Sequence, residues 1–209
     1  MGNYKWGEMN EDRTKPLKVC LFISRNKDND LIAKTNPDYK ERRKSFLTRS
    51  TPEELHDTFN DFVNKGCDGE WSRMYLSVNA RDEAKIKKQL IHYLVDDENI
   101  KLVTLEAKVA GIAATKECAL EKKWMFDFDS EDTDLLCRFI SQINELDKDV
   151  KVGIHRTPHG YAVITSRGFD ARLKDGSLLL DNWKDIVTLK RDDMLCVDWA
   201  VKKGTNGVR

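Results

Sequence analysis

Alternating aromatic and polar positions single out residues 123–129 as the most distinctive strand of the chain. In the sequence KWMFDFD, three aromatic side chains alternate with Met125, Asp127 and Asp129. Successive side chains on a strand point to opposite faces, so the pattern predicts a β-strand with both aspartates on one face, about 6.6 Å apart. Two neighbouring carboxylates repel each other, and aspartate is a poor strand residue. A divalent cation such as Mg²⁺ or Mn²⁺ between them would explain the pair; the alternative is a strand that ends at a sheet edge with both aspartates in water.

The same patterns divide the rest of the chain into strands and helices. Residues 17–24 are nearly all apolar and predict a central strand buried on both faces. Residues 25–49 are polar without a clear period, which predicts a long loop or a solvated helix face. A capping threonine, a proline and two acids at 51–54 start a helix that ends at Gly66. The further predicted elements are a strand at 73–78, helices at 82–94, 99–120 and 130–146, a hairpin at 150–165, a short strand or turn at 177–180, and final strands at 185–190 and 194–200.

This order of elements predicts an α+β (α/β) fold with a mixed sheet. We expect one domain over residues 17–201, made of an N-terminal α/β unit at 17–122 and a strand–helix–hairpin unit at 123–201 that shares its sheet. Residues 1–16 are expected to form a flexible arm and residues 202–209 a frayed tail.

Composition narrows the classes of function. The net charge is zero, which argues against strong non-specific nucleic-acid binding, but an acidic middle lies between basic ends, as expected if carboxylates gather at one site with cations around it. No apolar run approaches the roughly 18 residues of a membrane helix, and the N-terminal segment is polar, so we expect a cytoplasmic protein without a membrane partner. The five cysteines are scattered with no CxxC pair, which predicts reduced thiols and no thiolate zinc site.

Further candidate residues lie downstream of strand 123–129. Asp198 interrupts the apolar strand MLCVDWA, and it completes a three-carboxylate metal site if that strand lies beside 123–129. Asp181 in LLLDNW is the second choice, and either aspartate could instead cap a backbone amide. The predicted hairpin and the chain beyond it carry side chains suited to phosphates, with a solvated hairpin tip as the alternative. These side chains are His155, Arg156, His159, Arg167, Lys190 and Arg191.

Taken together, these motifs resemble the catalytic domain of the archaeo-eukaryotic primase (primase-polymerase) superfamily, in a small stand-alone form such as a virus would carry. In that family an hhDhD strand opens a strand–helix–hairpin unit related to the RNA-recognition fold (RRM-like), and FDFD with Asp127 and Asp129 matches it. The family's third aspartate lies on a late apolar strand, matching Asp198 in LCVDW. The segment YLSVNAR at 75–81 resembles a strand of the family's N-terminal unit. The resemblance covers residues 18–201.

One position departs from the family pattern. The family's small-x-His motif on the hairpin would place a histidine at Ala162. His159, three residues earlier, or His155 on the facing strand could contact the triphosphate instead. Otherwise the domain is impaired in nucleotide binding.

The resemblance implies a nucleotidyltransferase of DNA replication, a primase or DNA polymerase that joins nucleoside triphosphates on a single-stranded template, with a helicase or another replication protein as partner. It would act in the cytoplasm, and in the host cytoplasm if the protein is viral. Its cofactor would be Mg²⁺ or Mn²⁺, as two ions about 3.5–4 Å apart. The resemblance implies that the metal and catalytic residues are Asp127, Asp129 and Asp198, that His155, Arg156, His159, Arg167 and Lys190 bind the nucleotide, and that Arg42, Arg43, Lys44 and Arg191 bind the template.

Two other functions stay open. The first is a catalytically impaired domain of this fold that binds nucleic acid or protein, which the zero net charge and Ala162 both favour. The second is a metal-dependent nuclease that uses the same aspartates.

Overall fold

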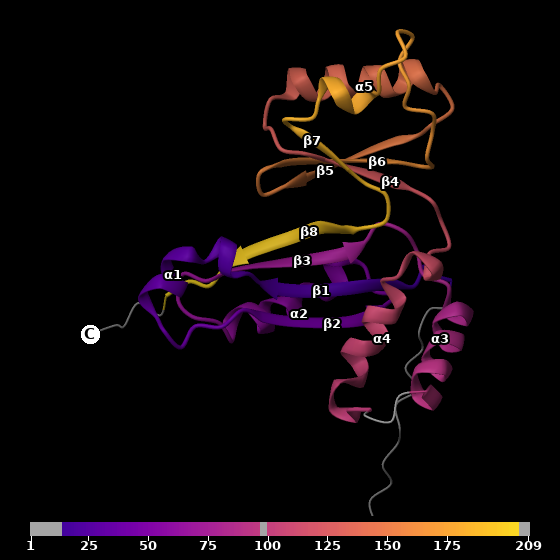
Figure 1. Cartoon of the computed structure of the whole chain (residues 1–209). Coiled ribbons are helices and arrows are strands. Elements are labelled where there is room, and N and C mark those ends of the chain that lie inside the picture. Colours follow the sequence, from indigo (N-terminus) through magenta and orange to yellow (C-terminus); the bar gives the residue numbers. More distant parts are fainter. Residues whose placement is uncertain (1–13, 97–99, 205–209) are drawn as a thin grey trace, which may run out of the picture.

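The computed structural model describes residues 14–96 and 100–204, which form two four-stranded sheets with helices packed against them (Figure 1). The strand orders are β2-β1-β3-β8 and β5-β6-β4-β7, and every pairing is antiparallel. The predicted α+β fold is confirmed, but the expected mixed sheet shared by both units is not formed. Most of the expected arm at 1–16 and tail at 202–209 lies outside the described residues. In the part that is described, no helix has the length and apolar character needed to cross a membrane.

The first sheet contains one strand that the hydrophobic pattern did not predict. Its strands are β1 (Lys18–Ser24), β2 (Arg42–Thr48), β3 (Trp71–Ser77) and β8 (Met194–Val201). β1 is central, as its apolar run predicts, and pairs with β2 and β3. β2 lies where a polar loop was expected. Because β2 is an edge strand, half of its backbone faces water, and charged side chains suit such a position.

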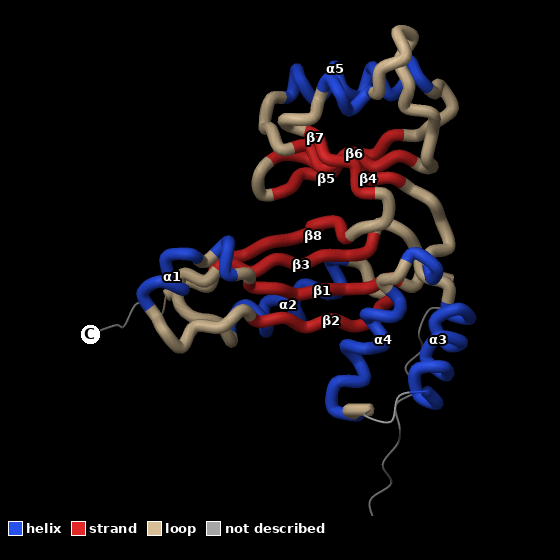
Figure 2. The backbone as a smooth tube through the Cα atoms, viewed as in Figure 1, coloured by secondary structure: helices blue, strands red, loops and turns tan. Residues whose placement is uncertain are grey.

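Helices cover the two faces of the first sheet unequally (Figure 2). α2 (Pro52–Asn64) buries Leu55, Phe59 and Phe62 against one face. Its predicted start is confirmed, because Thr51 and Glu54 form a reciprocal capping box. The remaining helices of this unit are α1 (Asp30–Thr35), α3 (Glu83–Asp96) and α4 (Leu105–Ala113), with single 3-10 turns at Asn26–Asp28, Leu102–Thr104 and Lys116–Cys118. α3 and α4 cover one end of the opposite face, and the helix expected over 99–120 is thus a short α-helix between two turns.

The second sheet places the acidic strand in its interior. Its strands are β4 (Trp124–Phe128), β5 (Val152–Thr157), β6 (Gly160–Thr165) and β7 (Val187–Lys190). α5 (Thr133–Leu146) covers one face, where Phe126 and Phe128 are fully buried against Phe139. The short strand or turn expected at 177–180 is a 3-10 helix at Leu179–Asn182. As the alternation of KWMFDFD predicts, the aromatic residues lie in the core and the aspartates lie on the opposite face.

β8 returns to the first sheet after the second is complete, so the second unit ends near residue 193 and not at 201. A small apolar core joins the units, formed by Val78, Met125, Ala162 and Leu195. Polar contacts also hold the two places at which the chain passes from one unit to the other. They come from Asn79, which donates to the carbonyl of Lys123 and accepts its N–H, and from Arg81, which donates two hydrogen bonds to Asp192.

Candidate functional site

Asp127 and Asp129 lie on the face of the second sheet that is turned away from α5. Asp127 is opposite Ala162 on β6 and Thr188 on β7, and Ala162 is in turn opposite His155 on β5. Side chains directly opposite each other in an antiparallel sheet share a face. His155, Ala162, Asp127 and Thr188 therefore form one row, which crosses the sheet over three strand spacings, or about 14 Å.

Lys190 is the predicted nucleotide-binding residue that lies beside the acidic pair. Its Nζ is 2.8 Å from Oδ2 of Asp127 and 3.8 Å from Oδ2 of Asp193. Burial lowers the pKa of Lys190, but the hydrogen bond to Asp127 and the charges of Asp127, Asp193 and Asp129 outweigh it and leave the pKa raised. Lys190 is therefore an ammonium ion at neutral pH, and it neutralises part of the charge that a divalent cation would otherwise neutralise.

Asp198 does not join the pair, because its strand has a different neighbour from the one expected. β8 pairs with β3, and Asp198 lies opposite Met74 in the first sheet. Its carboxylate is 3.4 Å from Nδ1 of His56 on α2 and accepts the N–H of Trp199. The strand beside β4 is β7, so Thr188 lies next to Asp127.

The two strands differ in burial. Leu195 and Cys196 are both buried although adjacent side chains point to opposite faces, so β8 needs cover on both sides. On β7, Thr188 is exposed and Lys190 is partly exposed, although β7 and β8 are each the edge strand of their own sheet. The second choice, Asp181, accepts the backbone N–H of Leu178 at 2.9 Å, which is the capping role considered as its alternative.

The side chains that lie together would supply a metal ion with fewer ligands than the three carboxylates predicted. Among the described residues, no group of three or more histidine, cysteine, aspartate or glutamate side chains is placed to hold a metal ion. Mg²⁺ often binds through one or two carboxylates and completes its coordination with water and substrate phosphates. Asp127 and Asp129 supply those carboxylates, provided that Lys190 leaves Asp127 for a phosphate.

Two of the predicted phosphate-binding arginines face away from the acidic pair and have other partners. Arg156 pairs with Glu131 at 2.6 Å and stacks over the ring of Tyr161. Arg167 pairs with Asp147 at 2.8 Å. Neither arginine is placed with Asp127, and their part in nucleotide binding stays a prediction.

The two histidines of the hairpin lie in different surroundings. His155 is exposed on the row of Asp127 and lies directly across from Ala162. His159 lies at the hairpin tip, where its Nε2 is 3.1 Å from Nη2 of Arg73 on the first sheet. His159 thus faces the other unit and not the acidic strand.

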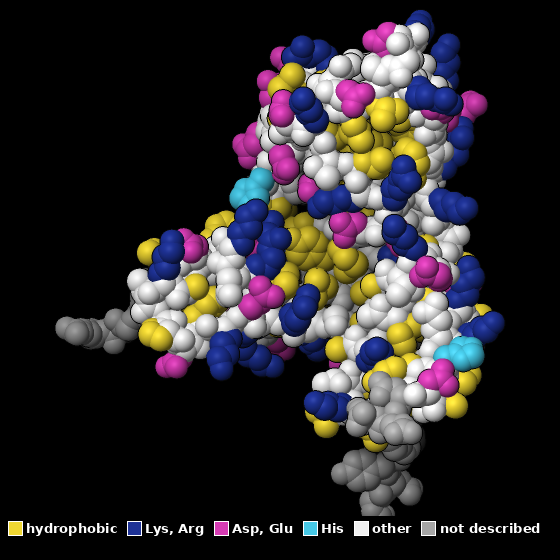
Figure 3. All heavy atoms as spheres, viewed as in Figure 1, with side chains coloured by type: hydrophobic (Ala, Val, Ile, Leu, Met, Phe, Trp, Pro, Cys, Tyr) yellow, Lys and Arg dark blue, Asp and Glu magenta, His cyan; other side chains and the backbone are white. Residues whose placement is uncertain are grey.

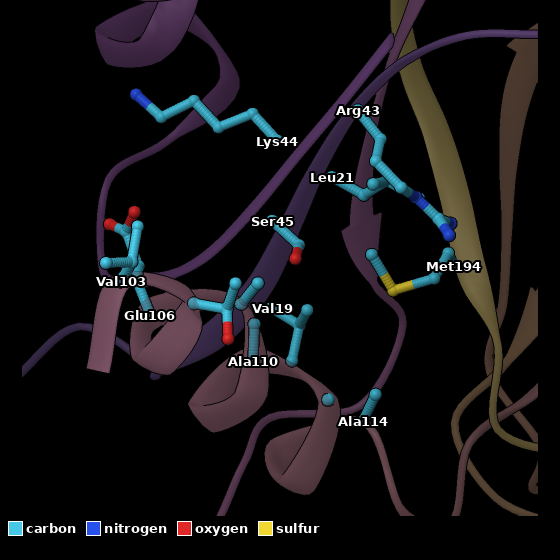
Figure 4. A pocket seen from close by; sticks show the side chains of 13 residues that line it. Val19, Leu21, Arg43, Lys44, Ser45, Val103, Glu106, Ala110, Ala114 and Met194 are labelled. Carbon is cyan, nitrogen blue, oxygen red and sulfur yellow. The ribbon is translucent and has the colours of Figure 1, made fainter. Parts of the chain in front are cut away.

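The predicted template-binding residues are also separated. Arg42 is bound to the buried Glu70 and has a structural role. Arg43 and Lys44 line a hollow of about 550 Å³ between α4 and the first sheet, where their side chains point in opposite directions (Figure 4). Arg191 is exposed and stacks 5.2 Å from the centre of the Trp124 ring.

A buried ionic network on the first sheet was not predicted. Asp28 accepts hydrogen bonds from Arg25 at 2.8 Å and from Arg73 at 2.6 Å. Burial raises the pKa of Asp28, but the hydrogen bond from Arg25 and the charge of Arg73 outweigh it and lower the pKa overall. The available signal was Arg73 itself, a charged residue within a strand that is otherwise largely apolar, as Asp198 is in its own strand.

The surface between the two sheets is hollowed, with hydrophobic side chains on its floor and lysine and arginine side chains around it (Figure 3). No family model, no curated protein and no solved structure matches this chain.

Proposed function

We propose that this chain is a metal-dependent nucleotidyltransferase of the primase-polymerase kind, which joins nucleoside triphosphates on a single-stranded template between the two sheets. The observation that carries the proposal is the position of the partly exposed Asp127 and the exposed Asp129 on one sheet face, with the charged Lys190 2.8 Å from Asp127. Phosphoryl transfer needs carboxylates for a cation and fixed positive charge for the phosphates, and catalysis comes mainly from positioning and electrostatics.

In the proposed reaction, a 3′-hydroxyl oxygen attacks the α-phosphorus of the triphosphate. A new P–O bond forms, the bond to the bridging oxygen of the β-phosphate breaks, pyrophosphate leaves, and the hydroxyl proton passes to water. A bound Mg²⁺ or Mn²⁺ would supply charge neutralisation at the phosphates. Asp127 and Asp129 hold that cation, while Lys190 and His155 bind the triphosphate from the same sheet face.

A second candidate is a domain that binds nucleic acid without catalysis. Thr188 lies beside Asp127 where the third carboxylate of a two-ion site was expected, and Lys190 already compensates Asp127. Both observations favour loss of catalysis over a complete two-ion centre. The nuclease alternative uses the same carboxylates and differs only in its product.

A primer-extension experiment separates these functions. The full chain is incubated with labelled primer–template, nucleoside triphosphates and Mn²⁺, and the products are separated by length. We expect extension, and a loss of at least tenfold in rate for Asp127→Asn, because one carboxylate of the cation site is removed without a change of shape. Asp198→Asn is the matched control and should keep the wild-type rate, because Asp198 lies on the first sheet.

Other results decide against extension. A shortened strand supports the nuclease. If the nucleic-acid strands keep their length and Mn²⁺ leaves the melting temperature of the protein unchanged, both the metal site and the enzymatic function are overturned. A cation that binds the native state must stabilise it. Extension that survives Asp127→Asn places the chemistry elsewhere.

A further inference from the structure

A second pocket, of about 280 Å³, lies between the first sheet and the tip of the β5–β6 hairpin. It contains two of the five tryptophans of the chain and four cationic or titratable side chains. We call it the tryptophan pocket, and its lining residues are Lys27, Asp28, Trp71, Arg73, Pro158, His159 and Trp199.

Strand pairing brings the aromatic residues and the arginine to one sheet face. Arg73 on β3 lies directly opposite Trp199 on β8, and Trp71 precedes Arg73 by two positions. Trp71 is held by the buried Asn29, which accepts its N–H at 2.6 Å and donates to its carbonyl at 3.0 Å. The backbone of Trp71 is therefore fixed while its side chain stays 40% exposed. A large aromatic ring with a fixed backbone and an open face suits stacking of a planar ligand.

The charge around the tryptophan pocket is positive. Arg25, Lys27 and Arg73 contribute three positive charges, and Asp28 is the carboxylate in the pocket lining. The guanidinium of Arg73 is 8% exposed, and its Nε has no hydrogen-bond partner among the described residues. That Nε is enclosed by protein, so the atom of this guanidinium that an acceptor in the pocket can reach is Nη2, which contacts His159. His159, which contacts it from the exposed hairpin tip, can be displaced by such an acceptor.

We infer that the tryptophan pocket binds one base and its adjoining phosphate from a single nucleic-acid strand. The inference deepens the proposed function, since the strand bound there would be the template or its continuation. Aromatic rings that stack bases, next to lysine and arginine that contact phosphates, are the recurring chemistry of single-strand binding. The volume holds one nucleotide unit and the ring needs an unstacked base, so a duplex does not fit the pocket.

Equilibrium binding to a labelled dT12 oligonucleotide tests the inference. The full chain is titrated by fluorescence anisotropy in EDTA without nucleoside triphosphates, so that the metal-dependent chemistry plays no part. We expect Trp71→Ala to raise the Kd about tenfold or more and Trp71→Phe to stay near the wild-type value, because phenylalanine keeps a stacking face. Lys27→Ala should weaken binding and reduce the slope of log K against log salt by about one phosphate contact.

Matched variants keep this result separate from the proposed catalysis. Lys34→Ala removes an exposed lysine that pairs with Asp30 on α1, outside the pocket lining, and should leave the Kd unchanged. Asp127→Asn should also bind dT12 as the wild type does, even though it is expected to slow extension at least tenfold. If Trp71→Ala binds dT12 normally, the pocket assignment is overturned while the proposed function stands.

Binding of the mononucleotide dTMP shows whether the pocket takes its base and phosphate from a strand or from a free nucleotide. If Trp71→Ala loses affinity for dTMP as strongly as for dT12, the pocket takes a free nucleotide and the strand assignment is overturned. Absence of dT12 binding by the wild-type chain overturns it as well. Binding of dT12 that depends on Trp71, with dTMP at least a hundredfold weaker, supports the strand.

Discussion

Among single residues, Lys190 lies beside Asp127, where its ammonium group would compete with a cation of the proposed site. Its ammonium is 2.8 Å from Asp127. Replacing it by methionine keeps the length of the side chain and removes the charge. We expect Lys190→Met to bind Mn²⁺ more tightly, seen as a larger rise in melting temperature at the same Mn²⁺ concentration, because Asp127 loses its competing partner. Extension should fall at least tenfold, because the triphosphate loses a charged contact.

Lys184→Met provides the control, since Lys184 is exposed in the turn before β7. It should match the wild type in both assays. The same Mn²⁺ response in Lys190→Met as in the wild type would contradict a cation site at Asp127.

The sign of the pKa change defines the useful pH range for this comparison. The pKa of Lys190 is raised in the folded state, so its ion pair stabilises the fold fully below the usual value of 10.5 and is lost only as the pH rises through the raised value. Between about pH 6 and 9 the lysine stays charged. A change of Mn²⁺ response within that range must come from other groups.

At the same scale, sequence reasoning found the carboxylates and missed most of their surroundings. Asp127 and Asp129 could be assigned to one face because alternation is a local property of the strand. The contact of Lys190 with Asp127 and that of Arg73 with His159 join residues 63 and 86 positions apart. Such contacts follow from strand pairing, which a single sequence does not reveal.

Among the elements, the strands were easier to predict than their neighbours. β7 and β8 were both expected, but β8 was placed beside the acidic strand, where β7 lies. Each of these strands is the edge strand of its sheet, so the sequence of neither strand specified which sheet it would join. β2 was missed because an edge strand can be largely polar, so its sequence lacks the hydrophobic alternation of an inner strand.

The β5–β6 hairpin supplies a prediction at this scale, because its turn packs against the end of β4. Gly160 has φ of 156°, and a Cβ added there would overlap the carbonyl oxygen of Phe128 and lie 2.9 Å from the backbone N of Ser130. We expect Gly160→Ala to lower the free energy of unfolding by about 2 kcal/mol, since backbone atoms on both strands must move. Urea denaturation followed by circular dichroism measures the change.

Gly153→Ala on β5 is the matched control. Its Cβ would meet its nearest atom, the carbonyl oxygen of Ile164, at 3.9 Å. This substitution should be neutral or stabilise the fold by up to about 1 kcal/mol, because alanine lowers the entropy of the unfolded chain. Equal effects of the two substitutions would rule out the close approach at Gly160 as the cause.

For the whole molecule, the two units meet at the joint formed by Val78, Met125, Ala162 and Leu195, and the surface between the sheets is hollowed (Figure 3). The division into an N-terminal unit and a strand–helix–hairpin unit was predicted, but the return of β8 to the first sheet was not. That return makes the chain cross the joint twice. The segment YLSVNAR, noted for its family resemblance, contacts both crossings through Asn79 and Arg81. Its polar residues thus have a structural role that motif comparison alone does not indicate.

The ion pair of Arg81 and Asp192 gives the last prediction, because it is buried at this joint. The side chains are 1% and 7% exposed, and the guanidinium donates two hydrogen bonds, at 2.9 and 3.0 Å. We expect Arg81→Met to lower the free energy of unfolding by about 3–5 kcal/mol, because Asp192 remains buried without its partner. The double variant Arg81→Met/Asp192→Leu should recover part of that loss, because no uncompensated charge remains.

Urea titration followed by tryptophan fluorescence measures all four members of this double-mutant cycle. The exposed pair of Arg172 and Asp170 provides the control, and Arg172→Met should leave the midpoint unchanged. A double variant no more stable than Arg81→Met would show that the loss arises from packing rather than from the uncompensated charge. Two separate unfolding transitions in Arg81→Met, against one in the wild type, would show that this pair couples the two sheets into one cooperative unit.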